Sequence, residues 1–182
     1  MIDQKTVVIS ELNRLATKVS TESAADDTQV STPLLFGLGP RLKIWWDKQE
    51  IRTLEFTYAM RKKSPDYIYF KAHYYRELPT GFKLISRNSV LREKLGRMKD
   101  ETETGIAQID EVYSSSGNIS LITRLLLDPS ISNSVWVWNI DILSSPNARD
   151  IVGVIGTKGD VQPKKLEGLF NFVLDLAMKA PG

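Results

Sequence analysis

Apolar residues recur at helical spacing in three segments of the chain, and this pattern predicts three helices. The first helix is predicted over residues 3–20. Its apolar stripe consists of Val8, Leu12, Leu15 and Val19. The second helix is predicted over residues 88–100, with a basic polar side. The third is predicted over residues 163–178, where Pro163 suits the first turn of a helix.

Between the first two predicted helices the pattern changes to an alternation of apolar and polar residues, which is the period of a strand. The segments predicted to be strands are 41–46, 50–61, 67–76 and 82–87. Turn-forming residues separate these segments, including Pro65 with Asp66 and Pro79 with Gly81. Short strands joined by such turns predict an antiparallel meander.

Strand patterns also dominate the region between residue 106 and the last helix. The segments predicted to be strands are 106–113, 119–127, 134–143 and 151–155, with a loop over 114–118. The pattern of 119–127 fits a helix as well, because Leu121 and Leu125 are four residues apart. The turn residues on both sides favour a strand there. Alternation is clearest in 134–143, which reads SVWVWNIDIL.

The order helix, strands, helix, strands, helix predicts an α+β fold with antiparallel sheet and helices at the N-terminus, in the middle and at the C-terminus. A length of 182 residues suits one domain over residues 1–182. The polar and acidic segment 20–33 has no apolar period, and we expect it to be a flexible loop. If the helices cover one face of the sheet, the other face is left to water or to a partner.

Charge and aromatic residues are concentrated in the predicted meander. Residues 41–100 carry 15 Lys and Arg against 7 Asp and Glu, whereas the segments before and after are both acidic. The chain has no cysteine, which excludes disulfides, thiol catalysis and cysteine metal sites and suits a reducing compartment. No run approaches the length of a membrane span, and the N-terminus lacks the layout of a signal peptide. We therefore expect a cytoplasmic protein with a basic patch and no membrane partner.

One face or rim of the predicted meander combines basic and aromatic side chains. The candidate binding residues are Lys43, Trp45, Arg61, Tyr67, Tyr69, Lys71, His73, Tyr75 and Lys83. These residue types occur at protein interfaces, and they also stack on unpaired bases and neutralise phosphates. We expect a non-enzymatic binding module or adaptor with a protein partner. A homodimer and a nucleic-acid binder, for single-stranded nucleic acid or RNA, remain open alternatives.

Two features keep an enzymatic function open without favouring it. His73 is the only histidine, and a general base needs partners that the sequence does not reveal. The glycine-rich segment 153–160 runs from a predicted strand toward a predicted helix and could contact a phosphate. Its candidate phosphate-binding residues are Gly156, Thr157, Lys158 and Gly159. The glycine spacing matches neither a P-loop nor a dinucleotide fingerprint, and we expect no metal or cofactor.

Overall fold

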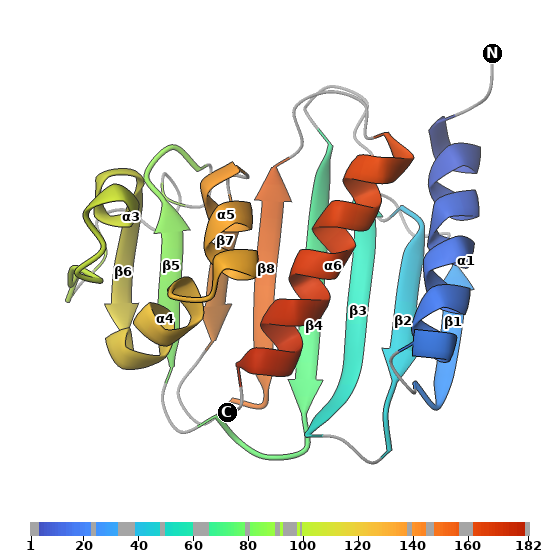
Figure 1. The fold of residues 1–182 in the computed structure, drawn as a ribbon, viewed down its shortest axis with the longest axis horizontal. Helices are drawn as coiled ribbons and strands as arrows, with labels where there is room; N and C mark the ends of the chain where they lie inside the picture. The colour runs from blue at the N-terminus through green and yellow to red at the C-terminus, as the bar shows by residue number, and fades with distance from the viewer. Residues whose placement is uncertain are drawn as a thin grey trace.

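The computed structural model describes residues 4–22, 25–32, 39–47, 50–59, 66–78, 81–89, 92, 98, 100–137, 140–144, 148–156 and 162–180. These residues form an eight-stranded antiparallel sheet with helices packed on it (Figure 1). The helices lie at the N-terminus, in the middle and at the C-terminus of the chain. The fold class is therefore α+β, as the sequence predicts.

The strands are β1 (Asp27–Ser31), β2 (Arg41–Trp45), β3 (Ile51–Ala59), β4 (Tyr67–Tyr74), β5 (Phe82–Ser86), β6 (Tyr113–Gly117), β7 (Ile140–Ser144) and β8 (Asp150–Gly156). The helices are α1 (Gln4–Glu22), α3 (Ala107–Val112), α4 (Ile119–Leu126), α5 (Pro129–Val137) and α6 (Pro163–Lys179). Across the sheet the strand order is β1-β2-β3-β4-β8-β7-β5-β6.

The predicted meander is confirmed for β2, β3 and β4, but it does not continue to the fourth strand. On the side away from β3, β4 pairs with β8, and β7 lies between β8 and β5. On β8 the residues of both faces are apolar: Ile151 and Ile155 are buried, while Val152 and Val154 on the other face are half-buried. A strand that is apolar on both faces suits a central position in a sheet. The alternation within β5 could not reveal that β8 and β7 separate it from β4.

One face of the sheet is buried beneath the helices, which all lie on the same side in Figure 1. On β3, Phe56 meets Phe170 of α6 edge to face, with ring centroids 5.5 Å apart. On β4, the buried Tyr74 hydroxyl donates to the Ala177 carbonyl of α6 at 3.0 Å. The apolar stripe predicted for the first helix is buried as well. The core therefore lies between this face and the helices.

Three predictions for residues 106–127 are wrong. Residues 107–112 form α3 instead of a strand, and residues 113–117 form strand β6 instead of a loop. Residues 119–126 form α4, because helical spacing buries its leucines at 121, 125 and 126 together. The Asn118 side chain caps α4 by accepting a hydrogen bond from the Leu121 amide at 3.0 Å. Asn118, one of the turn residues that flank this segment, therefore acts as a helix cap.

The strand predicted over residues 134–143 is wrong in its first half. Helix α5 runs through Val137, and β7 begins at Ile140. Ile131 and Val135 are both buried and lie four residues apart, which is a helical repeat. The Asp128 side chain accepts a hydrogen bond from the Ser130 amide at 2.9 Å, at the start of this helix. The local alternation around Trp136 is thus overridden by the burial of one helix face.

The flexible loop predicted over residues 20–33 is also wrong over much of its length. Helix α1 continues to Glu22, and β1 pairs with β2 in antiparallel register. Most of the predicted helix over residues 88–100 lies outside the described residues. The helices predicted at the two ends of the chain are confirmed as α1 and α6.

Gly153 makes room for a ring in the core. An added Cβ atom at this position would lie 2.2 Å from the Cζ atom of Phe70, which is its partner on β4. We expect Gly153→Ala to destabilise the fold by about 1–3 kcal/mol, because the ring would have to move within a packed core. Urea unfolding of the variant and the parent measures this difference.

The control is Gly168→Ala in α6, where an added Cβ meets no atom within 4 Å. We expect this substitution to stabilise the protein by about 0.5–1 kcal/mol through the helix propensity of alanine. If both substitutions changed the free energy of unfolding in the same direction, the role assigned to Gly153 would be contradicted.

Candidate functional site

The face of the sheet turned away from the helices carries most of the predicted binding residues. We call the outward-facing residues of β2, β3, β4 and β8 the open face. It consists of Arg41, Lys43, Trp45, Thr53, Glu55, Thr57, Tyr67, Tyr69, Lys71, His73, Asp150, Val152 and Val154. Of the predicted residues, the six on β2 and β4 are half-buried and alternate with buried neighbours. In the described part of the chain no helix lies over this face.

Strand register arranges the open face in rows that run across the strands. One row aligns Lys43 with Glu55 and then with Lys71. The next row aligns Thr53 with His73 and then with Asp150. Positive and negative side chains therefore alternate across neighbouring strands, a pattern that favours cross-strand ion pairs.

Two carboxylates pair with the basic side chains of the open face and partly offset their charge. Glu55 lies 3.1 Å from the Lys43 ammonium and 3.5 Å from the Arg41 guanidinium. Asp150 lies 3.2 Å from the Lys71 ammonium and 2.7 Å from the His73 Nδ1 atom. The predicted convergence of positive charge is thus offset by acids from β3 and β8.

Aromatic rings lie among these ion pairs. The Lys43 ammonium lies 5.1 Å from the ring centroid of Trp45, within cation–π range. Tyr69 lies between Thr57 of β3 and Val154 of β8. Partial burial raises the pKa of the Tyr69 hydroxyl above its ordinary value, and the nearby Lys71 charge opposes this shift. The rings therefore sit partly embedded in the sheet surface.

The remaining predicted residues are dispersed. Tyr75 follows the end of β4 and is exposed. Its ring centroid lies 5.8 Å from the Arg52 guanidinium. Its hydroxyl donates a hydrogen bond to the Trp46 carbonyl at 3.0 Å. Lys83 is exposed on β5, two strands beyond β8. Gly156 is exposed at the end of β8. Arg61, Thr157, Lys158 and Gly159 lie outside the described residues.

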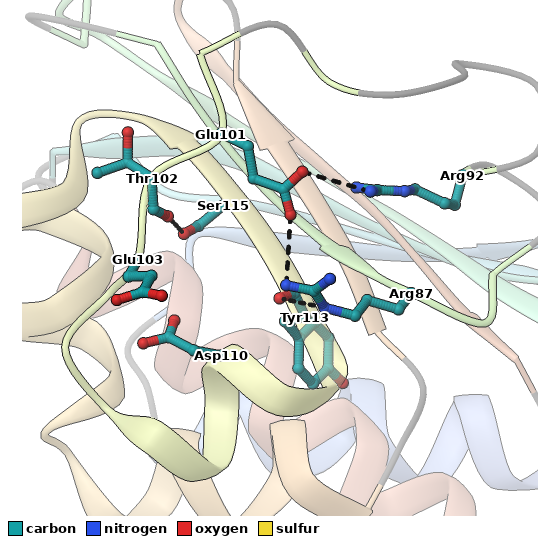
Figure 2. A pocket seen from close by; sticks show the side chains of 8 residues that line it. All are labelled: Arg87, Arg92, Glu101, Thr102, Glu103, Asp110, Tyr113 and Ser115. Carbon is teal, nitrogen blue, oxygen red and sulfur yellow. Dashed lines mark hydrogen bonds and ion pairs between the residues drawn. The ribbon is translucent and has the colours of Figure 1, made fainter.

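A second candidate site, which we call the β6 pocket, lies at the other end of the sheet (Figure 2). Its volume is about 390 Å³. Its lining residues are Arg87, Arg92, Glu101, Thr102, Glu103, Asp110, Tyr113 and Ser115. The segment around Thr102 runs along β6, since the Thr102 amide donates to the Ser115 carbonyl at 2.9 Å and the Ser115 hydroxyl donates to the Thr102 carbonyl. The pocket therefore joins the end of β5, the edge strand β6 and helix α3.

Glu101 is held by two guanidinium groups on one side of the β6 pocket. Its carboxylate oxygens lie 3.4 Å from Arg87 and 3.3 Å from Arg92. The Ser114 hydroxyl, together with these two cations, lowers the pKa of Glu101 from its ordinary value. The Nη1 atom of Arg92 is buried, and it has no hydrogen-bond partner within the part of the chain that the structure describes.

The two other carboxylates of the β6 pocket, Asp110 and Glu103, differ in their hydrogen bonds. Asp110 accepts hydrogen bonds from the amide and hydroxyl of Thr104, at 2.8 and 2.9 Å, and from the Gly105 amide at 3.1 Å. Glu103 is exposed, and the structure records no bond for it among the described residues. In Figure 2 the Glu103 and Asp110 side chains point toward one another, on the side of the pocket away from Arg92.

No motif or local pattern in the sequence predicts the β6 pocket. Residues 100–105 are mostly acidic and polar, Arg92 lies in the basic helix predicted over residues 88–100, and neither pattern places them together. The only local signal is the change from a basic segment to an acidic one near residue 100. Contacts between β5, β6 and α3 are needed to bring these charges into one cavity.

Comparisons with known proteins show no family for this chain. No protein-family model matches, and no curated protein matches. A solved structure, the mycobacterial trehalose monomycolate transport factor A (TtfA), is similar with a TM-score of 0.43 and 9% sequence identity. The match covers 92% of this chain and 93% of that one. At this level of likeness it carries no argument about fold or function.

Two further observations concern the described residues alone. None of their helices combines the length and the apolar character needed to cross a membrane. They also contain no group of three or more acidic or histidine side chains placed to hold a metal ion.

The lowered pKa of Glu101 gives a pH-dependent prediction. A carboxylate whose pKa is lower in the folded state stabilises that state above its unfolded-state pKa, and the stabilisation is lost as the pH falls through the folded-state pKa. We expect the free energy of unfolding to decrease less steeply for Glu101→Gln than for the parent between about pH 5 and about pH 3. Chemical denaturation at several pH values measures the two slopes.

Glu111→Gln is the matched control, because Glu111 is exposed on α3 and does not line the β6 pocket. It should leave the slope unchanged. A slope for Glu101→Gln equal to that of the parent would show that the contacts of Glu101 do not stabilise the fold.

Proposed function

We propose that the chain is a non-enzymatic binding module that engages a protein partner through the open face. The observation that carries this proposal is the combination of partly embedded rings with cations that already have carboxylate partners. Trp45, Tyr67 and Tyr69 supply apolar area with polar edges, which is the composition enriched at protein interfaces. Aromatic residues of this kind commonly carry much of the affinity of such interfaces.

The ion pairs favour a protein partner over a nucleic acid. Affinity for a phosphate backbone comes from cations that are free to replace condensed counterions. On the open face Arg41 and Lys43 share Glu55, while Lys71 and His73 share Asp150. A polyanion would be repelled by these two carboxylates, whereas a protein surface of mixed charge can leave the pairs in place around buried rings.

Site-specific photocrosslinking in cells tests the proposed surface. We expect a photoreactive phenylalanine analogue at Tyr69 to give a discrete protein adduct, because this ring lies in the middle of the open face. The same analogue at Asn171, which is exposed on α6, should not give that adduct. Trp45→Ala in the Tyr69 variant should reduce the adduct by about tenfold or more, as expected for an aromatic hot spot.

Circular dichroism and the unfolding midpoint of Trp45→Ala show whether the fold is retained. Adducts of equal yield from Tyr69 and Asn171, or an adduct at Tyr69 that a folded Trp45→Ala variant leaves unchanged, would overturn the assignment of the open face as the interface.

Removing the two carboxylates tests the choice between protein and nucleic acid. We expect the parent to show no binding to single-stranded oligonucleotides at physiological salt. Glu55→Gln with Asp150→Asn frees the cations of the open face, so this double variant should acquire oligonucleotide binding that weakens steeply with salt. Fluorescence anisotropy at several salt concentrations measures both proteins.

The control for the change in net charge is Glu50→Gln with Glu111→Gln, at two exposed positions outside the open face. It should not bind oligonucleotides. Tight and salt-sensitive binding by the parent itself would favour the nucleic-acid alternative over a protein partner.

A further inference from the structure

The β6 pocket has a separation of charge that the proposed open-face function does not use. We propose that it binds a small zwitterion that carries an additional amine, with a free basic amino acid as the representative ligand. The ammonium groups would lie against Glu103 and Asp110, and the carboxylate would lie against Arg92. This site is independent of the open face, because none of its lining residues belongs to that surface.

The size of the pocket suits a ligand of this kind. A volume of about 390 Å³ falls near the lower end of the range found for small-molecule sites. The described lining residues almost all carry charged or hydroxyl side chains, and Tyr113 is the aromatic residue among them. A polar lining of fixed charges selects a charged ligand over an apolar one, since an apolar ligand would leave these groups without water or a partner.

The carboxylate side of the pocket can accept a cation. Three donors from Thr104 and Gly105 fix the orientation of Asp110. A carboxylate has about four acceptor positions, so Asp110 can still accept one more hydrogen bond. Glu103 is recorded without a bond in the described part of the chain. An ammonium between these two groups would make charge-assisted hydrogen bonds, which are stronger than neutral ones.

The arginine side of the pocket can accept an anion. Arg92 uses its Nη2 atom to contact Glu101 at 3.3 Å, and its side chain is 20% exposed. Arg87 also contacts Glu101 and is exposed beside it. A ligand carboxylate would bind to the exposed parts of these guanidinium groups through charge-assisted hydrogen bonds.

The balance of charge determines which zwitterion fits best. Among the lining residues that the structure describes, two arginines face three carboxylates, which gives this part of the lining a net charge of −1. A ligand with two ammonium groups and one carboxylate has the opposite net charge. We therefore expect L-lysine to bind more tightly than a neutral amino acid, and L-glutamate not to bind.

Isothermal titration calorimetry of the full chain with four ligands tests each part of this assignment. L-lysine should bind. Cadaverine lacks the carboxylate of lysine and L-norleucine lacks its side-chain amine, so each should bind at least about fivefold more weakly, as expected for the loss of a charge-assisted contact. L-glutamate should give no heat of binding. An absence of binding by both lysine and cadaverine at about 10 mM, a concentration that detects even millimolar affinity, would overturn the proposal.

Variants then locate the ligand within the pocket. Glu103→Gln should weaken the binding of both lysine and cadaverine by about tenfold, through loss of a charged acceptor. The neighbouring control Glu111→Gln should bind both ligands as the parent does. Arg92→Met should reduce lysine affinity to that of cadaverine and leave cadaverine affinity unchanged, because only lysine presents a carboxylate.

Folding of each variant is checked by its unfolding midpoint, and Arg92→Lys serves as a second probe if Arg92→Met unfolds. A folded Arg92→Lys variant should keep part of the preference for lysine over cadaverine. Binding would occur elsewhere if Glu103→Gln and Glu111→Gln lost equal affinity for lysine. The same would follow if a folded Arg92→Met variant kept the full preference for lysine over cadaverine. Failure of the open-face crosslinks would not affect these titrations, since they use the isolated chain.

Discussion

Burial of one sheet face beneath α6 is the interaction on which the rest of the structure depends. Phe170 meets Phe56 edge to face, and the Tyr74 hydroxyl reaches the Ala177 carbonyl near the C-terminal end of the helix. These contacts fix which residues of β3 and β4 point inward. Because side chains alternate along a strand, the same contacts turn the rings of Tyr67 and Tyr69 and the charges beside them away from the helices.

The position of β8 next to β4 changes the chemical character of the open face. It places Asp150 beside Lys71 and His73, and it places Val152 and Val154 in the middle of the surface. Without β8 the outward residues of β2, β3 and β4 carry more positive than negative charge. With β8 the cations are paired and the centre is more apolar. This pairing is the physical basis on which we propose a protein partner over a polyanion.

The two candidate sites are built in different ways. The open face uses regular strand register, so its side chains are held in rows by backbone pairing and by cross-strand ion pairs. The β6 pocket lies between a strand end, an edge strand and a short helix. Its charges are held by side-chain contacts such as those of Glu101 with two arginines. We propose a large partner for the sheet face with its rings and a small ligand for the charged cavity.

The sequence alone determined α1, α6 and strands β2 to β5 and β8, and it identified the outward residues of β2 and β4. These features depend on local periodicity in segments with a single clear pattern. Tertiary structure decided the helices between residues 107 and 137, because short apolar runs there fit both helical and strand periods until burial selects one. It also decided the strand order, the pairing of His73 with an aspartate 77 residues away, and the assembly of the β6 pocket. Those outcomes depend on contacts between distant segments, which no local pattern encodes.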